Sequence, residues 1–374
     1  MQTALRADRV FDGHRMIGTA TVVVDDGRIV AVEEREVADA VDLGDVTLLP
    51  GLVDAHVHLA FDESLDLVAG MQVDDERLLA RMHAAAHKTL AAGVTTVRDL
   101  GDRGFLALQV ETPLTVLAAG PPITTPGGHC HFLGAEAGSL DEMLRAVALR
   151  AEKGCAVVKV MCSGGNITPG SSLFEPQFTA SELRVVVDEA HRLGMHTAAH
   201  VHAPEGVRNA VDAGFDTFEH LSFATEDGVA TDYAVLQRLV DDGKVLSTTV
   251  GSLPGFAPPP AIAARLAQAL EHWTWLAERG ARIVNGTDAG LAPGKPHGVL
   301  PHALTATHPI LGGERGLAAM TSASAEGIGL GGRKGVLAPG ADADLLAVRG
   351  NPVEQPEALL DVVGVWARGE AVHR

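Results

Sequence analysis

The sequence is poor in several residue types that mark particular classes of protein. It has three cysteines in 374 residues, one tyrosine, and only 4% aromatic residues. Cys130, Cys155 and Cys162 are too few and too irregularly spaced for a disulfide framework or for a zinc site built on Cys-x-x-Cys pairs. Disulfide-rich secreted folds and cysteine-based zinc modules are therefore excluded.

The chain also lacks the signals of secretion, membrane insertion and polyanion binding. No apolar run reaches the roughly 18 residues of a membrane-spanning helix, and residues 1–8 contain no apolar segment typical of a signal peptide. Lys and Arg number 29 against 48 Asp and Glu, a formal net charge of −19. Because nucleic acids and anionic membranes repel acidic surfaces, we expect neither as a partner. We expect a cytoplasmic protein, with a symmetric homo-oligomer as the default assembly.

What the chain does contain is a repeated helix–glycine–strand unit. Glycine suits the left-handed position after a helix, and a near-continuous apolar strand suits a parallel sheet buried on both faces. Two further strands are predicted at 52–58 and 114–119, which gives eight in all. Eight such units predict an α/β fold of the (β/α)8 TIM barrel type, with a doubly wound open sheet as the alternative. The repeated units lie at 91–99, 152–160, 192–200, 212–220, 241–249 and 278–288.

Two helices of these units have recognisable starts, and the chain ends differ from the middle. Ser139 and Thr179 each stand three residues before a glutamate, as a capping box requires. Residues 19–34 alternate polar and apolar around an Asp-Asp-Gly turn, and 367–370 is a second hairpin candidate. We predict a small β-sandwich domain built from both termini, at 1–50 plus 331–374, beside a barrel domain at 51–330.

Histidine, at 17 residues, is the unusual part of the composition and directs attention to metal chemistry. In a barrel, functional groups sit where strands end and loops begin. His56 and His58 lie two apart on a predicted strand, so their side chains point to the same side and can bind one metal ion. The other polar groups at predicted strand ends are Lys159, His200, His202, His220 and Asp288.

Lys159 is the anomaly in this set. Its neighbours Val158 and Val160 place it inside a predicted strand, where an unpaired ammonium is costly, and the chain has only six lysines. Burial lowers the pKa of an amine, and a neutral amine can react with carbon dioxide to give a carbamate. Such a group offers one oxygen to each of two metal ions. A structural salt bridge to a barrel carboxylate is the alternative.

These residues, in this order, resemble the amidohydrolase superfamily. The resemblance rests on His-Val-His within PGLVDAHVHL, on Lys159, His200 and His220, and on Asp288 within NGTDAG; GVLAPGADADLLAVRGNP resembles the returning strand of that family's β-sandwich. VKVMCSGGN at 158–166 is similar to the imidazolonepropionase-like branch, which includes metal-dependent dipeptidases and carboxypeptidases that cleave before Pro, Arg or Lys.

The resemblance implies a binuclear hydrolase of a C–N amide bond, acting on a dipeptide or N-acyl amino acid. Carbamylated Lys159 (N6-carboxylysine) and a hydroxide would bridge two divalent metal ions, and zinc is the expected metal. Asp288 would take the proton during attack and pass it to the leaving amine; with Lys159 and His220 it forms the catalytic set. The implied ligands are His56, His58 and Asp288 for one ion, His200 and His220 for the other, with Lys159 between them.

Three further histidines are candidate substrate-binding residues. His129 and His131 stand in the long glycine-rich loop 120–138, and His202 follows His200 on the same side, where it is also an alternative ligand in place of His200. Residue 203 is alanine where deaminases of the superfamily carry a glutamate, which favours amide hydrolysis. The alternatives are a single-metal hydrolase or deaminase of a cyclic amide or imidazolone-like ring, and a non-catalytic relative of the barrel.

Overall fold

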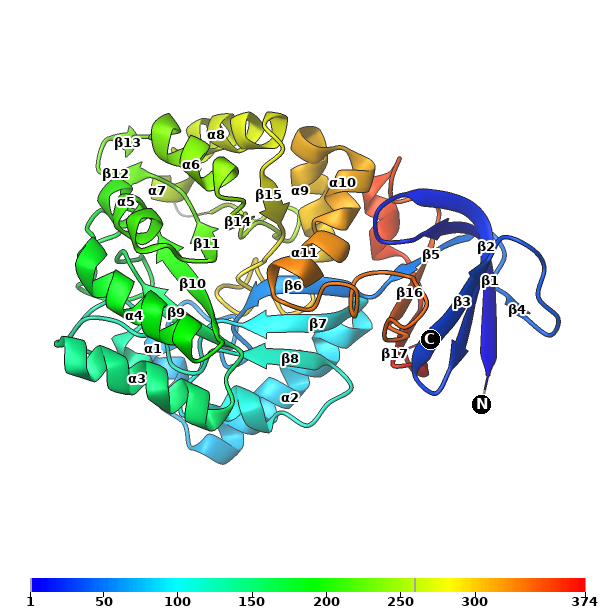
Figure 1. Ribbon diagram of the computed structural model, residues 1–374, viewed down its shortest axis with the longest axis horizontal. Coiled ribbons are helices and arrows are strands. Elements are labelled where there is room, and N and C mark those ends of the chain that lie inside the picture. The colour runs from blue at the N-terminus through cyan, green and yellow to red at the C-terminus, as the bar shows by residue number, and fades with distance from the viewer. Residues whose placement is uncertain (1, 259, 374) are drawn as a thin grey trace.

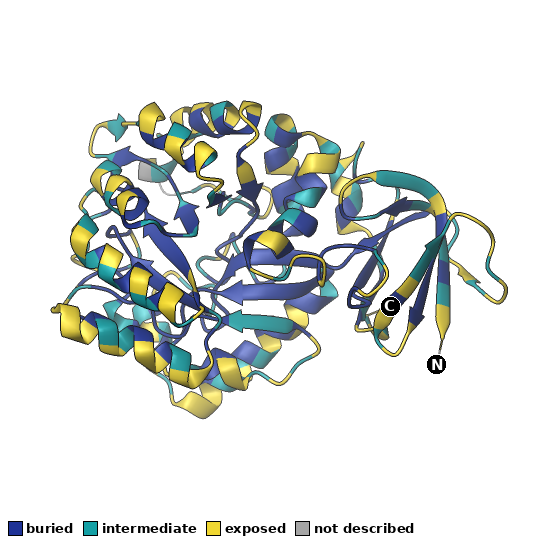
Figure 2. Ribbon diagram, in the orientation of Figure 1, coloured by how far each residue is buried: buried dark blue, intermediate teal, exposed yellow. Residues whose placement is uncertain are grey.

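The structure, a computed structural model, describes residues 2–258 and 260–373. A large α/β part with strands inside and helices outside lies beside a smaller sheet that holds both chain ends (Figure 1). Buried residues follow the strands, and exposed residues follow the outer faces of the helices (Figure 2). No helix of the described residues is long and apolar enough to cross a membrane.

The large part contains the eight predicted parallel strands, arranged as two sheets. The first sheet has the order β6 (Leu52–Val57), β7 (Val94–Asp99), β8 (Thr115–Ala118). The second has the order β15 (Arg282–Val284), β14 (Val245–Ser247), β11 (Thr217–His220), β10 (His196–Val201), β9 (Val157–Met161).

Only isolated contacts join these two sheets. One seam has a parallel bridge between Val57 and Ala289, and the other a bridge between Ile123 and Val160. The N–H of Ala156 also donates to the carbonyl of Ala118 at 3.0 Å. The sequence analysis predicts a closed barrel, but the described strands do not form one continuous closed ladder. The reason is that β15 and β8 are short, so that the pairing passes to loop residues.

The helices lie outside the strands, and capping side chains mark where two of them begin. At the start of α4 the capping box is complete: Thr179 accepts from the N–H of Glu182 at 3.3 Å, and the glutamate carboxylate accepts from the threonine N–H at 2.8 Å. At α3 the box is incomplete, since Glu142 accepts from Gly138 at 2.8 Å rather than from the capping serine. The helices are α1 (Leu67–Gly70), α2 (Asp75–Ala91), α3 (Leu140–Lys153), α4 (Ala180–Arg192), α5 (Pro204–Ala213), α6 (Tyr233–Asp241), α7 (Pro260–Ala263), α8 (Leu266–Glu278), α9 (Pro301–Leu311), α10 (Gly313–Ala318) and α11 (Ser322–Gly327).

Both chain ends pair into one mixed sheet. Its order is β18 (Glu370–His373), β17 (Val362–Ala367), β16 (Leu345–Arg349), β5 (Val46–Pro50), β1 (Thr3–Phe11), β2 (Met16–Asp25), β3 (Arg28–Glu33), with β4 (Val41–Asp42) on β1. The antiparallel pairing of β16 with β5 joins the C-terminal strands to the N-terminal ones. Both predicted hairpin turns are present, but the hydrogen bonding gives a single sheet and does not by itself define two facing layers.

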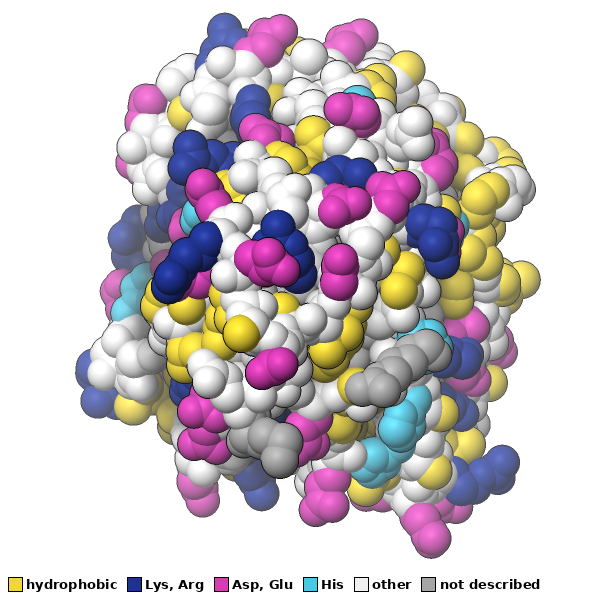
Figure 3. All heavy atoms as spheres, turned by 90° about the vertical axis from the view of Figure 1, so that its right-hand side faces the viewer, with side chains coloured by type: hydrophobic (Ala, Val, Ile, Leu, Met, Phe, Trp, Pro, Cys, Tyr) yellow, Lys and Arg dark blue, Asp and Glu magenta, His cyan; other side chains and the backbone are white. Residues whose placement is uncertain are grey.

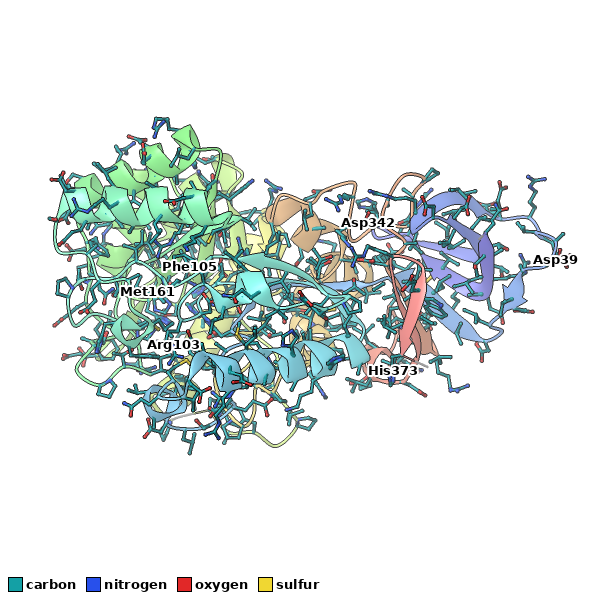
Figure 4. All side chains as sticks on the ribbon, turned by 90° about the horizontal axis from the view of Figure 1, so that it is seen from below. Asp39, Arg103, Phe105, Met161, Asp342 and His373 are labelled. Atoms are coloured by element: carbon teal, nitrogen blue, oxygen red, sulfur yellow. The ribbon has the colours of Figure 1, made fainter. Side chains whose placement is uncertain are left out.

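Buried charged side chains tie the segment before β16 to this sheet. Asp342, labelled in Figure 4 beside the terminal sheet, accepts from Arg28 at 2.6 Å and from Lys334 at 3.0 Å. Lys334 also contacts Asp344 at 2.6 Å, and all three of Asp342, Asp344 and Lys334 are buried.

Acidic and basic side chains are interspersed over the face shown in Figure 3. A small hairpin, β12 (Ala224–Thr225) with β13 (Gly228–Val229), follows β11.

Candidate metal centre

The six predicted ligands lie at or just beyond the carboxyl ends of the strands. Because parallel strands bring their carboxyl ends to the same side, residues far apart in sequence meet there. Met161, which ends β9 two residues after Lys159, is labelled inside the large part in Figure 4. Two groups of possible metal ligands result, one of His56, His58 and Asp288 and one of His200, His202 and His220.

In the first group, three ligand atoms converge. Nε2 of His58 is 3.2 Å from Oδ1 of Asp288, and Nε2 of His56 is 3.5 Å from the same oxygen. The two Nε2 atoms are 3.3 Å apart. The other ring nitrogens are occupied: Nδ1 of His56 faces Oε2 of Glu219 at 2.9 Å, and Nδ1 of His58 faces the carbonyl of Gly101 at 2.9 Å.

This pattern fixes which nitrogens carry protons. A nitrogen that faces a carboxylate or a carbonyl must donate, so each Nδ1 is protonated and a neutral ring leaves its Nε2 lone pair free. Burial lowers the pKa of His56 to about 4, which keeps the ring neutral. Although burial opposes it, the neighbouring His56 and His58 hold the pKa of Asp288 well below its usual value. Although burial opposes it, the hydrogen bond to Asp288 raises the pKa of His58. Two imidazoles and one carboxylate are a donor set that suits zinc.

The second group consists of three stacked or edge-on imidazoles. The ring centres of His200, His202 and His220 are 4.5 to 4.6 Å apart. Nδ1 of His220 contacts Oγ1 of Thr249 at 2.9 Å, and Nδ1 of His202 contacts Oγ of Ser222 at 2.8 Å. Burial, with His202 beside it, lowers the pKa of His200 well below its usual value. The structure thus brings together both alternatives, His200 and His202, that the sequence analysis kept open.

Lys159 is fully buried, and its amine has no hydrogen-bond partner among the described residues. Burial lowers the pKa of this amine, while the carboxylates of Glu219 and Asp288 act in the opposite direction. The ring centres of His56 and His220 are 5.3 Å apart, so the two ligand groups adjoin. The orphaned amine therefore accompanies one group of imidazole and carboxylate donors and one group of imidazoles alone.

The strand ends adopt unusual backbone conformations at the residues that matter. His220 has a φ of 70° and Asp288 a φ of 60°, in the left-handed region that costs a side chain free energy. In a regular strand, neighbouring side chains point to opposite faces. The left-handed turn at His220 breaks this alternation, so that both Glu219 and His220 reach His56. The backbone N–H of Asp288 is held by the carbonyl of His56 at 2.7 Å.

Sequence reasoning missed the buried carboxylate behind His56. Glu219 accepts from Arg98 Nη2 at 2.8 Å and from Thr217 Oγ1 at 3.1 Å, and Arg98 also donates from Nε to the carbonyl of Ala55 at 2.8 Å. Arg98, Thr217 and Glu219 are buried. The contact between Arg98 and Glu219 joins residues more than one hundred positions apart, so no local spacing reveals it. The only signal in the sequence is that each is a charged residue inside an apolar strand.

The three candidate substrate-binding histidines lie in different environments. The ring of His129 is buried, 4.7 Å from that of His200, with its Nδ1 atom 3.0 Å from Oγ1 of Thr168. His202 belongs to the second ligand group. His131 instead has its Nδ1 atom 3.0 Å from the carbonyl oxygen of Gly128 in its own loop.

Comparison with known proteins agrees with this geometry. The profile of the amidohydrolase family matches residues 47–372. The chain belongs to the amidohydrolase family. The resemblance read from the sequence is confirmed, and the protein is a hydrolase of C–N bonds whose relatives act on small molecules or dipeptides.

Three relatives of this amidohydrolase show what it is similar to. A solved Xaa-Pro dipeptidase with methionine bound in its active site has a TM-score of 0.87 and 26% identity, and the match covers 99% of each chain. A solved prolidase in complex with N-methylphosphonate-L-proline has a TM-score of 0.86 and 26% identity, with 100% of both chains covered. The ochratoxinase of Aspergillus niger is 27% identical, over 86% of this chain and 75% of its own.

Proposed function

We propose that this amidohydrolase is a binuclear metal-dependent enzyme that hydrolyses the amide bond of a dipeptide or N-acyl amino acid. The observation that carries the proposal is the orphaned amine of Lys159 between two groups of metal-ligand side chains. The activities of the relatives support the substrate class, since a dipeptidase and a prolidase both cleave an amide next to an amino acid. The family also supports the finer fold: residues 51–330 as a (β/α)8 barrel, and 1–50 with 331–374 as a β-sandwich domain.

The two groups of converging side chains support the proposed ligand sets. Zinc is the metal best suited to imidazole and carboxylate donors, and a carbamate on Lys159 would give each ion one oxygen. When bound, the two ions supply an activated water and polarise the scissile carbonyl. His56, His58 and Asp288 would hold one ion, and His200 and His220 would hold the other, with His202 in the same group of side chains.

Residues of the chain transfer the proton and orient the substrate and the metal ligands. Asp288 stays ionised because His56 and His58 hold its pKa low, so that its carboxylate can accept the proton of the attacking water. The same carboxylate passes the proton to the leaving nitrogen. His129 lies beside the second ligand group, where its ring can contact the substrate carbonyl or carboxylate. Buried Glu219 and Arg98 keep the ring of His56 in place.

Hydrolysis of defined amides by the metal-loaded enzyme tests this proposal. The panel consists of Xaa-Pro and Xaa-Arg dipeptides, N-acyl amino acids, and cyclic amides with imidazolone-like rings. We expect turnover of the linear amides that disappears on chelation and returns with zinc and bicarbonate. Turnover confined to the cyclic substrates, with one metal ion per chain, would contradict the proposal and support the single-metal alternative.

A further inference from the structure

The ladder between β14 and β15 ends before it reaches the ligand groups. The last paired residues are Ser247 and Val284, and the N–H of Thr248 makes the final strand-to-strand bond at 3.1 Å. Beyond this point the chain segments diverge toward Thr249 and Thr287. Among the described residues, neither of those two carbonyl oxygens accepts a backbone N–H. Thr287 is buried and Thr249 half-buried, and a carbonyl shielded from water without a partner is unfavourable, so another donor is needed.

The ammonium of Lys295 supplies that donor to both carbonyls. Its Nζ atom lies 2.7 Å from the carbonyl oxygen of Thr249 and 2.8 Å from that of Thr287. The lysine reaches this place because its own loop folds back. The N–H of Gly290 donates to the carbonyl of Lys295 at 2.8 Å, and the N–H of Lys295 donates to that of Ala292 at 2.8 Å. One side chain thus replaces the missing end of the ladder.

Each carbonyl belongs to a residue that supports a different ligand group. Thr249 contacts Nδ1 of His220 through its hydroxyl at 2.9 Å. Thr287 directly precedes Asp288, and its hydroxyl donates to buried Asp54 at 2.6 Å. The lysine therefore connects the support of a histidine in one group to the backbone beside the carboxylate of the other.

We propose that Lys295 is a positioning residue that sets the separation of the two ligand groups by clamping Thr249 to Thr287. The inference rests on the proposed metal-dependent function. A lysine suits the task because its ammonium carries three donors and can serve two carbonyls at once. Burial lowers the pKa of this ammonium, and the carboxylates of Asp288 and Asp54 offset that cost.

A matched pair of lysine variants tests the clamp. Lys244 makes the same kind of bond, from Nζ to the carbonyl of Gly214 at 2.9 Å, but just before the opposite end of β14. We compare Lys295→Met with Lys244→Met in the full-length enzyme. The readouts are zinc affinity of the metal-free protein, by competition with a chromophoric chelator, and kcat and KM of the zinc-loaded protein.

The clamp predicts different results for the two variants. Lys295→Met loses about 10- to 100-fold in zinc affinity, as outer supports of metal ligands do. Its kcat falls by about 10²-fold, the effect of a small misplacement, while KM stays within about twofold. Lys244→Met keeps both values. Equal zinc affinity in the two variants would overturn the clamp, and so would a raised KM with unchanged zinc affinity, which would assign Lys295 to substrate binding.

Conservative variants keep the test decisive if Lys295→Met does not fold. Lys295→Arg retains a cation with several donors, whereas Lys295→Gln retains neither charge nor reach. We expect the arginine variant to bind zinc at least about tenfold more tightly than the glutamine variant. Equal affinities would overturn the clamp. Wild-type protein that binds no divalent metal would refute the proposed function itself. Wild-type protein that binds zinc with an affinity that no Lys295 variant changes would refute only the clamp.

Discussion

The Nδ1 atom of His56 and the Oε2 atom of Glu219 lie 2.9 Å apart in a fully buried contact. The carboxylate makes the histidine carry its proton on Nδ1 and direct Nε2 toward Asp288. Arg98 neutralises the carboxylate from its other side at 2.8 Å. The pair therefore links a buried ion pair to the ligand group.

Replacing the carboxylate behind His56 should weaken metal binding without removing any ligand. Glu219→Gln leaves Arg98 without its counter-charge and no longer fixes the proton on Nδ1. We expect a loss of about 10- to 100-fold in zinc affinity. The control is Glu205→Gln, because Glu205 is exposed on α5. Zinc affinities that agree between the two variants would remove Glu219 from the account.

Asp288 is expected to be the group that moves the proton. Asp288→Asn retains the oxygen that can face a cation but cannot accept a proton at pH 7. We predict a fall in kcat of at least about 10²- to 10⁴-fold, with metal still bound. Single-turnover kinetics and elemental analysis on the same sample separate the two effects. Full activity of the variant would exclude Asp288 as the base.

Lys159 is expected to act through a group added to its amine. Lys159→Ala should lose most of its activity, and short carboxylates such as acetate or propionate should restore part of it by filling the vacated space. Lys153→Ala, at an exposed lysine that ends α3, is the matched control. Wild-type activity in Lys159→Ala would show that the amine joins no cations.

The two histidines of the glycine-rich loop give an internal comparison. His129 lies beside His200, whereas His131 bonds within its own loop. His129→Ala should change the preference among Xaa-Pro, Xaa-Arg and N-acyl substrates by about tenfold or more in kcat/KM, with metal content retained. His131→Ala should leave that preference unchanged. A uniform loss over all substrates in His129→Ala, together with lost metal, would argue against substrate contact.

A buried carboxyl that is not itself a proposed ligand predicts how stability depends on pH. Burial, with Asp99 nearby, raises the pKa of Asp102 to about 8, and its Oδ1 atom has no partner among the described residues. The unfolded chain loses this proton near pH 4 and the folded chain near pH 8. This group therefore destabilises the folded state increasingly as pH rises through that window.

Asp102→Asn removes that titration. Urea unfolding at about pH 5.5 and about pH 8 should show that the variant loses less stability on going to the higher pH, by at least about 1 kcal/mol. Asp141→Asn, at an exposed residue of α3, is the control and should follow the wild type. Parallel losses in Asp102→Asn and the wild type would contradict the assignment.

Local sequence signals predicted the strands and the strand-end residues. Each of the eight predicted parallel strands is present, since glycine after a helix and a β-branched run are local features. The i, i+2 spacing of His56 and His58 likewise placed both rings in one group. These predictions needed no knowledge of which strands pair.

Some features could not be predicted from the sequence, because they depend on contacts between distant segments or on the backbone conformation of loops. Arg98 and Asp99 are neighbours on a strand and face apart, so each finds a partner far away in sequence. Arg98 pairs with Glu219, while Asp99 accepts from the N–H groups of Leu59 and Gly101. The role of Lys295 depends on its loop folding back, which no spacing reveals. The pairing at the seams between the two parallel sheets likewise runs through loop residues such as Ile123 and Ala289.

Metal content per chain tests the central claim most directly. The wild type and Lys159→Ala are each stripped by a chelator, reloaded with zinc in the presence of bicarbonate, freed of loosely bound ions and analysed for zinc. The account predicts about two ions per chain for the wild type and about one or fewer for the variant. A wild type that stays at about one ion while fully active, or a variant that holds as many ions as the wild type, would contradict a pair of metal ions joined through Lys159.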